Sequence, residues 1–228
     1  MVSLKDKIDV CVFDPYGTLF DTGSDTGYWR EILGDKADTL VELWRRKQME
    51  YTWWRSLVGA YEDFWHVTGA SLDAAMSHMG LNMDATLRSR LMSIFLRPNA
   101  HLEVKEVLAR LKESGVRTAV LSNGTLSMLV SAVKSADLYG LVDERITADT
   151  AKEFNPHPSV FQLTVDHLNV PADRICYLSA SAFDAAAGAF FGFKSVWVNR
   201  IGQHGEHLAA EPDCEINNLK RLPGLLGL

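Results

Sequence analysis

The sequence predicts an α/β fold in which a doubly wound parallel sheet carries an inserted helical cap domain. Short apolar runs rich in β-branched residues alternate with helical patterns through most of the chain, as parallel strands joined by crossover helices do. Residues 21–98 instead show helical spacing of apolar residues and no strand signal. A length of 228 residues with 47% hydrophobic content suffices for a sizeable core plus a small cap. The sheet domain is therefore expected to be Rossmann-like.

Five segments are expected to be strands: residues 9–14, 117–122, 145–147, 175–179 and 194–199. The first ends at Asp14, and polar residues also follow the second (Ser122 and Asn123) and the fourth (residues 179–184). Because the carboxyl ends of parallel strands meet at one edge, where open α/β sheets bind ligands, this convergence indicates a site. Taken alone, Asp14 would fit equally well as a carboxylate that caps the following turn.

The helical stretch predicts the division of the chain into a core domain of residues 1–20 and 99–228 and a cap domain of residues 21–98. A helical cap over a sheet edge is one way to close a site against water. Its apolar residues are alternatively the cap's own core or a dimer face; they are Leu40, Leu43, Trp44, Tyr51, Trp54, Leu57, Val58, Tyr61 and Trp65. After the cap, Leu102 through Leu111 predict an amphipathic helix that stops at Gly115.

Charge and composition exclude several classes of partner. The net charge of −6 and the absence of a long basic run argue against nucleic acid and anionic membrane as partners. No apolar stretch reaches spanning length, and the amino terminus lacks the apolar region of a signal peptide. Three scattered cysteines, two of them in expected strands, are interpreted as core residues of a cytoplasmic protein; they are Cys11, Cys176 and Cys214.

The polar strand ends resemble the successive motifs of a known family. Residues 14–19, 122–124 and 179–184 look like those of the haloacid dehalogenase superfamily, with the closest likeness to the L-2-haloacid dehalogenases. Residues 43–53 and 191–200 are also similar to theirs, so the resemblance covers essentially the whole chain. It implies a hydrolase that is a homodimer and acts on a small-molecule carboxylic acid substituted at C2.

Tyr16 distinguishes the branches of this superfamily. Its phosphatases place a second Asp there, which helps to bind magnesium, whereas an aromatic ring offers no hard oxygen ligand. The resemblance therefore implies substitution at carbon, with no metal and no cofactor. His204 and His207 have helical zinc spacing, but an isolated pair of histidines does not predict a metal site.

Catalytic roles follow from the resemblance. Asp14 would attack C2 and form an ester, which water then hydrolyses. Thr18 and Ser179 would hold Asp14 or its ester by hydrogen bonds. Arg45, from the cap, would receive the leaving anion, because a fixed cation stabilises developing charge. Asp184 would orient the hydrolytic water. A solvated helix face for Arg45 and a helix N-terminal carboxylate for Asp184 remain the structural alternatives.

The resemblance also implies a substrate-binding set. Ser122 and Asn123 would bind the substrate carboxylate together with backbone N–H groups near Tyr16. Phe64 would line the leaving-group pocket. Two residues from the 179–184 motif, Ser181 and Phe183, complete the expected set.

The chain departs from the family pattern at Asn155, which occupies the position of a lysine. Phe161 replaces a tyrosine, Ser181 an asparagine and Arg46 a glutamine. An ammonium about 4 Å from a carboxylate contributes about 4 kcal/mol at an effective dielectric constant of about 20. Without compensation, losing it would raise the pKa of the nucleophile.

Three explanations for Asn155 remain open. Lys152 or Arg46 could supply the missing cation. The substrate could instead bring its own charge, as would a strained cyclic amino acid such as azetidine-2-carboxylate, whose ring ammonium adjoins C2; Asn155 would accept its N–H. The third explanation is a catalytically inactive homologue. A halide leaving group agrees with most of the motifs and is the leading hypothesis, with a ring amine second.

Overall fold

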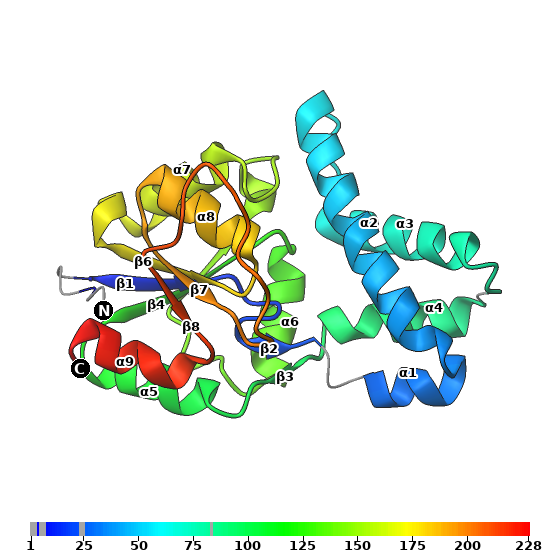
Figure 1. Cartoon of the computed structure of the whole chain (residues 1–228), viewed down its shortest axis with the longest axis horizontal. Helices are drawn as coiled ribbons and strands as arrows, with labels where there is room; N and C mark the ends of the chain where they lie inside the picture. The colour runs from blue at the N-terminus through cyan, green and yellow to red at the C-terminus, as the bar shows by residue number, and fades with distance from the viewer. Residues whose placement is uncertain (1–3, 5–7, 23–25, 83) are drawn as a thin grey trace.

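The computed structural model in Figure 1 describes residues 4, 8–22, 26–82 and 84–228. Its core is a sheet of six parallel strands in the order β5-β4-β1-β6-β7-β8. The strands are β1 (Val10–Phe13), β4 (Arg117–Ser122), β5 (Glu144–Thr147), β6 (Ile175–Ser179), β7 (Lys194–Val198) and β8 (Cys214–Ile216). The chain builds β4 and β5 on one side of β1 and then β6 to β8 on the other. The strand order therefore reverses at β1, where open sheets of this kind form a ligand crevice.

Strand β1 is central because both of its faces are apolar. Cys11 and Phe13 belong to one buried cluster, and Val10 and Val12 to another on the opposite side of the sheet. This two-residue alternation is what the pleat of a strand imposes. A strand buried on both sides must be covered by helices on both sides, as crossover connections provide.

Helices cover the two faces of the sheet (Figure 1). The core helices are α5 (Val104–Glu113), α6 (Leu126–Ser135), α7 (Pro158–Leu168), α8 (Ala182–Phe191) and α9 (Leu222–Leu226). Buried residues of α5, α6 and α9 join the cluster that contains Phe13, and those of α7 join the one that contains Val12. The 3-10 helices are η1 (Ser93–Phe95), η2 (Ala148–Thr150), η3 (Ala172–Arg174) and η4 (Leu219–Arg221). The α/β class and the doubly wound sheet are thereby confirmed.

The cap consists of helices that pack on one another beside the sheet (Figure 1). They are α1 (Thr26–Leu33), α2 (Lys36–Val58), α3 (Phe64–His78) and α4 (Ala85–Met92). The chain enters and leaves this region through two short segments, β2 (Phe20–Asp21) and β3 (Asn99–Ala100), which pair as an antiparallel ribbon. We infer that this ribbon marks the boundary between a core domain of residues 1–20 and 99–228 and a cap domain of residues 21–98.

Some expectations from the sequence were wrong or incomplete. Leu102 is fully exposed, because α5 begins only at Val104, so it is not part of the helix's apolar face. Gly115 does follow the end of α5, with a φ of 79°. Strand β8 and the ribbon were missed, because segments of three and two residues are too short to show a periodicity. Within the described part of the chain, none of the helices combines the length and apolar character needed to traverse a bilayer.

Candidate active site

Asp14 directly follows β1 and lines a cavity of about 390 Å³ between the sheet edge and the cap. Its backbone N–H donates to the carbonyl of Leu178 on β6 (2.9 Å), so the residue continues the sheet pairing by one position. Gly17 makes the turn that follows, with a φ of 92° that only glycine adopts without strain. The carboxylate is thereby held at the strand-order reversal, facing the cavity.

Two hydroxyl side chains support the region around Asp14: Ser179, at the end of the neighbouring strand β6, and Thr18, in the turn after β1. The Ser179 hydroxyl donates to Asp14 Oδ2 at 3.3 Å. Thr18 is fully buried and its Oγ1 accepts a hydrogen bond from the backbone N–H of Ala180 at 2.7 Å. Thr18 thereby ties the turn after β1 to the turn after β6.

Arg45 reaches the cavity from α2 in the cap. Its guanidinium lies over the ring of Phe95, 4.9 Å from the centroid, and its Nη1 donates to Gln48 Oε1 at 3.3 Å. Gln48 is buried and is fixed in turn by a 2.8 Å hydrogen bond to Thr68. Arg45 is thus held in the site by aromatic and amide contacts instead of lying on a solvated helix face.

Asp184 lies in the first turn of α8, where Ser181 is the N-cap and its hydroxyl accepts from the Asp184 backbone N–H. The Asp184 side chain also lines the cavity. The two expectations for Asp184 therefore do not exclude each other, because a carboxylate at a helix N-terminus can at the same time face a pocket.

The two carboxyl groups titrate far from their ordinary ranges. Burial, followed by the charge of Asp184, holds the pKa of Asp14 well above its usual range, against the Ser179 hydrogen bond and Arg45, which lower it. Burial raises the pKa of Asp184 to about 6. Burial also raises the pKa of Tyr16, so this phenol stays protonated and donates to the Phe95 carbonyl at 2.7 Å. Perturbed carboxyls in one cavity are typical of catalytic sites.

Ser122 and Asn123 line the cavity at the end of β4, close to Asn155. Asn123 Oδ1 accepts from the backbone N–H of Asn155 at 2.7 Å, and Asn155 Nδ2 donates to the Tyr177 hydroxyl at 3.2 Å. Asn155 Oδ1 is buried and has no hydrogen-bond partner among the described residues. A buried carbonyl oxygen without a donor is costly and indicates a place for a ligand donor.

Neither cation considered as a replacement for the lysine reaches this cavity. Lys152 Nζ binds Asp149 Oδ1 at 2.8 Å and lies over the ring of Tyr61, and its side chain is 65% exposed. Arg46 is 61% exposed and pairs with Glu50 on the outer face of α2. The hypothesis that Lys152 or Arg46 fills in is therefore wrong for this structure, because both side chains point to other partners.

The remaining expected residues divide between the cavity and its surroundings. Phe64 and Ser181 line the cavity. Phe183 does not belong to the lining; its ring packs edge-on against Trp53 of α2, with centroids 5.8 Å apart. Six further lining residues were not expected from the sequence, and neither was Tyr177, which fixes Asn155; the six are Thr22, Gln48, Met49, Thr52, Ala180 and Gln203. Met49 and Thr52 follow Arg45 at helical spacing, a signal that could have indicated them.

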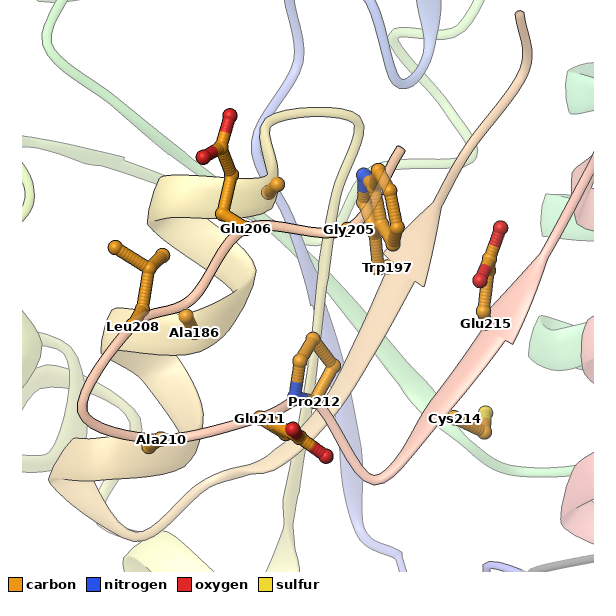
Figure 2. Close-up of a pocket in the computed structure, with 11 residues that line it drawn as sticks. Ala186, Trp197, Gly205, Glu206, Leu208, Ala210, Glu211, Pro212, Cys214 and Glu215 are labelled. Carbon is orange, nitrogen blue, oxygen red and sulfur yellow. The ribbon is translucent and has the colours of Figure 1, made fainter. Parts of the chain in front are cut away.

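A second cavity, of about 220 Å³, lies between α8, β7 and the segment around residues 205–215 (Figure 2). Figure 2 shows Trp197 and the exposed residues Glu206 and Glu215 among the side chains that line it. This cavity contains none of the residues expected to be catalytic. His204 and His207 are exposed, and no group of three or more potential metal ligands occurs among the residues that the structure describes.

Comparisons with known proteins agree with the geometry. A family model described as haloacid dehalogenase-like hydrolase matches residues 8–192. The chain is 37% identical to (S)-2-haloacid dehalogenase 1 of Pseudomonas sp. (strain CBS-3) over 97% of each chain. It is similar to a dehalogenase crystallised as an intermediate complex (TM-score 0.94, 35% identity, 98% and 99% of the two chains). It also resembles L-2-haloacid dehalogenase from Xanthobacter autotrophicus with chloropropionic acid covalently bound (TM-score 0.90, 29% identity, 96% and 98%).

Proposed function

The chain belongs to the haloacid dehalogenase-like hydrolases, and we propose that it converts a small 2-haloacid into the 2-hydroxy acid and halide. The observation that carries this proposal is Asp14, which lines a cavity of about 390 Å³ with Arg45 above it in the cap. A nucleophile on the core and a cation on the cap are what displacement of an anion from carbon requires.

In the first step, an Asp14 oxygen attacks C2 of the acid, and the carbon–halogen bond breaks with its electron pair. The halide leaves toward Arg45, whose position over Phe95 and beside Gln48 is fixed before the reaction. Preorganised charge of this kind lowers the barrier without rearrangement at the moment of reaction. Ser122 and Asn123, at the end of β4, hold the substrate carboxylate.

In the second step, water attacks the carboxyl carbon of the Asp14 ester. Asp184 accepts one proton from that water, and the bond between the Asp14 carboxyl carbon and the ester oxygen breaks. The second proton of the water passes to the departing oxygen, which releases the 2-hydroxy acid and leaves the Asp14 carboxylate. A pKa of about 6 suits Asp184 for this task near neutral pH. The product oxygen at C2 comes from Asp14, and the water oxygen stays on the enzyme.

A single turnover in heavy-oxygen water tests this order of events. The label is expected first in Asp14, detected by mass spectrometry of the peptide that contains it. Label that enters the product directly, with Asp14 unlabelled, would refute the ester. Arg45→Ala should lower kcat/KM by about 100-fold or more, the loss typical of a preorganised charge donor. Its neighbour Arg46, on the exposed face of α2, is the matched control, and Arg46→Ala should change little.

A second candidate is favoured by Asn155. Its buried Oδ1 lacks a donor, and the lysine of the family pattern is absent. The ring ammonium of an acid such as azetidine-2-carboxylate would donate to Asn155 Oδ1 and compensate the Asp14 and Asp184 carboxylates. Attack of Asp14 at C2 would then open the ring and release the amine at the far end of the same molecule.

Asn155→Lys separates the two candidates. With a 2-haloacid, the added ammonium would pair with Asp14 and the substrate carboxylate, so turnover should hold or rise. With a cyclic ammonium acid, two cations in one cavity repel by a few kcal/mol, enough to lower activity about 100-fold or more. Lys152→Ala is the control and should have little effect, because Lys152 binds Asp149. Inactivity of wild type and variant on both classes would support an inactive homologue.

We also infer a homodimer that works in the cytoplasm. Trp54, Leu57 and Val58 are 58%, 86% and 53% exposed at the end of α2, and Figure 1 shows this end projecting from the rest of the cap. A contiguous exposed apolar surface supports a protein contact. Leu57→Glu should convert the dimer to monomer in analytical ultracentrifugation.

The cysteines support the cytoplasm as the compartment. Cys11 and Cys176 are register neighbours on β1 and β6 and are free thiols, which supports a reducing compartment.

A further inference from the structure

Arg200 lies beyond the carboxyl end of β7, behind the turn that follows Asp14, and takes no part in the steps above. Its Nη2 donates to the backbone carbonyl of Thr18 at 2.6 Å, and its Nη1 donates to Glu103 Oε1 at 2.7 Å. The side chains of Arg200 and Glu103 are only 14% and 9% exposed. A buried ion pair contributes little net stability, since the desolvation of both charges opposes their attraction. Its position at the turn therefore suggests a role other than stability.

Thr18 transmits this contact to the site. Its carbonyl accepts from Arg200, and its hydroxyl oxygen accepts from the backbone N–H of Ala180. Ala180 directly follows Ser179, which donates to Asp14. One residue therefore joins Arg200 to both turns that frame the nucleophile.

His101 holds the adjacent carbonyl of the same turn. Its Nε2 lies 3.2 Å from the Gly17 carbonyl oxygen, and its backbone N–H donates to the Leu19 carbonyl at 2.9 Å. A carbonyl only accepts, so Nε2 carries the proton. Burial, followed by the charge of Arg200, lowers the pKa of His101, so this ring is neutral when it donates. Two consecutive carbonyls, of Gly17 and Thr18, are thus anchored from behind.

Arg200 does not act on Asp14 by its charge. Glu103 compensates the guanidinium, and the charged groups that shift the Asp14 pKa are Asp184 and Arg45. The contact of Arg200 is instead a charge-assisted hydrogen bond to a neutral carbonyl, which is stronger and more directional than a neutral one.

We propose that Arg200, backed by Glu103, is a positioning residue that sets the attack geometry of Asp14 by clamping the Thr18 carbonyl. The consequence for turnover rests on the proposed function, because it concerns the rate of ester formation. A displacement of about 1 Å at a reacting centre can lower a rate about 100-fold. The clamp acts on the placement of the nucleophile and leaves the substrate contacts of Arg45, Ser122 and Asn123 in place.

The test compares Arg200→Gln and Arg200→Lys with Arg174→Gln in the full chain. Arg174 is a matched control, because its Nη2 donates to Asp9 Oδ1 at 2.6 Å at the opposite end of the same sheet. Arg200→Gln should lower kcat on the order of 100-fold with KM changed less than about threefold, since ground-state contacts are unchanged. Arg200→Lys keeps a cation that can reach the carbonyl and should recover about tenfold of this loss. The pH at which kcat reaches half of its maximum should be the same in all variants. Arg174→Gln should keep the wild-type kcat.

Hydrogen exchange supplies a readout that needs no substrate. The N–H of Gly17, bonded to the Phe20 carbonyl, and that of Ala180 should exchange about tenfold faster in Arg200→Gln, with no change in Arg174→Gln. If wild type turns over neither acid class, the proposed function fails while this exchange still decides the clamp. A wild-type kcat in Arg200→Gln, a shifted pH midpoint, or protection lost uniformly across the chain in both Arg200 variants would each overturn it.

Discussion

At the scale of the residue, the site concentrates two carboxyl groups that are both difficult to ionise. Asp14 and Asp184 line the same cavity, and burial raises the pKa of each, to about 6 for Asp184. Arg45 and the Ser179 hydroxyl counter this only in part for Asp14. The arrangement costs stability at neutral pH. Both carboxyl groups have a higher pKa in the folded protein than in the unfolded chain, so their ionisation at neutral pH favours the unfolded chain. This cost supports a function for the pair, since selection for stability alone would favour an uncharged residue in place of one of the two carboxyl groups.

Activity and stability should therefore respond to pH in opposite directions. Asp184 must be ionised to accept a proton from water, so kcat should rise as the pH increases through about 6. The folded-state pKa of Asp184 lies above the unfolded value, so its contribution to stability falls as the pH rises from about 4 to about 6. Asp184→Asn should abolish turnover yet raise the Tm at pH 8 by about 2–4 °C. Asp166→Asn, on the exposed face of α7, is the control and should change neither value. A lower Tm for Asp184→Asn at pH 8 would contradict the assignment.

At the scale of the element, α8 supports the site by approaching β6 very closely. A Cβ added at Gly188 would lie 2.5 Å from Cδ1 of Tyr177, so the helix can approach this ring only with glycine there. The Tyr177 hydroxyl accepts from Asn155 Nδ2, the side chain that replaces the family's lysine. The packing distance between a helix and a strand therefore fixes the position of a pocket side chain.

Gly188→Ala should disturb both packing and catalysis. The added methyl group overpacks the α8–β6 contact, which should lower the free energy of unfolding by about 1–3 kcal/mol. Displacement of Tyr177 should also release Asn155 and reduce kcat/KM. Gly140 has no atom within 4 Å of an added Cβ, so Gly140→Ala should stay within about 0.5 kcal/mol of wild type. Urea denaturation of the two variants provides the comparison, and equal stabilities would contradict the packing argument.

At the scale of the whole molecule, residues of the cap contact the core segment that carries Asn155. Ser56 Oγ accepts from the backbone N–H of Phe154 at 3.1 Å, and the Tyr61 ring stacks on Phe154 with centroids 5.0 Å apart. The Tyr61 hydroxyl donates to Asp149 at 2.8 Å. The placement of the cap and the position of Asn155 are therefore coupled, and the site is complete only when the two parts meet.

Removal of two of these contacts tests the coupling. The double variant Ser56→Ala, Tyr61→Phe loses two hydrogen bonds, each contributing about 0.5–1.5 kcal/mol, so the free energy of unfolding should fall by about 1–3 kcal/mol. The double variant should also lose kcat/KM. Tyr139→Phe, at an exposed tyrosine on the core, is the control and should lose less. Stability loss without any change in kcat/KM would indicate that the cap contacts do not position Asn155.

The sequence by itself determined five of the six strands of the sheet, the helical cap and the place of Asp14. Apolar runs, helical spacing and polar strand ends are local patterns, and a strand that ends just before Asp14 must present it at the sheet edge. The motifs around Ser122 and Ser179 are local in the same sense. For these features the period of the backbone and the chemistry of adjacent residues suffice.

Only the tertiary structure decided which charged groups serve the site. Arg45 and Arg46 are adjacent in sequence, yet the rotation of α2 turns one into the cavity and the other to Glu50. Lys152 is near Asn155 in sequence but binds Asp149, and Arg200 reaches Thr18 across 182 residues. Such pairings depend on how elements that are far apart in the chain pack together. Rotating a helix about its axis by one residue would change the partners of all its side chains. No local pattern encodes that rotation, because it is fixed by the shapes of the surfaces that the folded chain brings together.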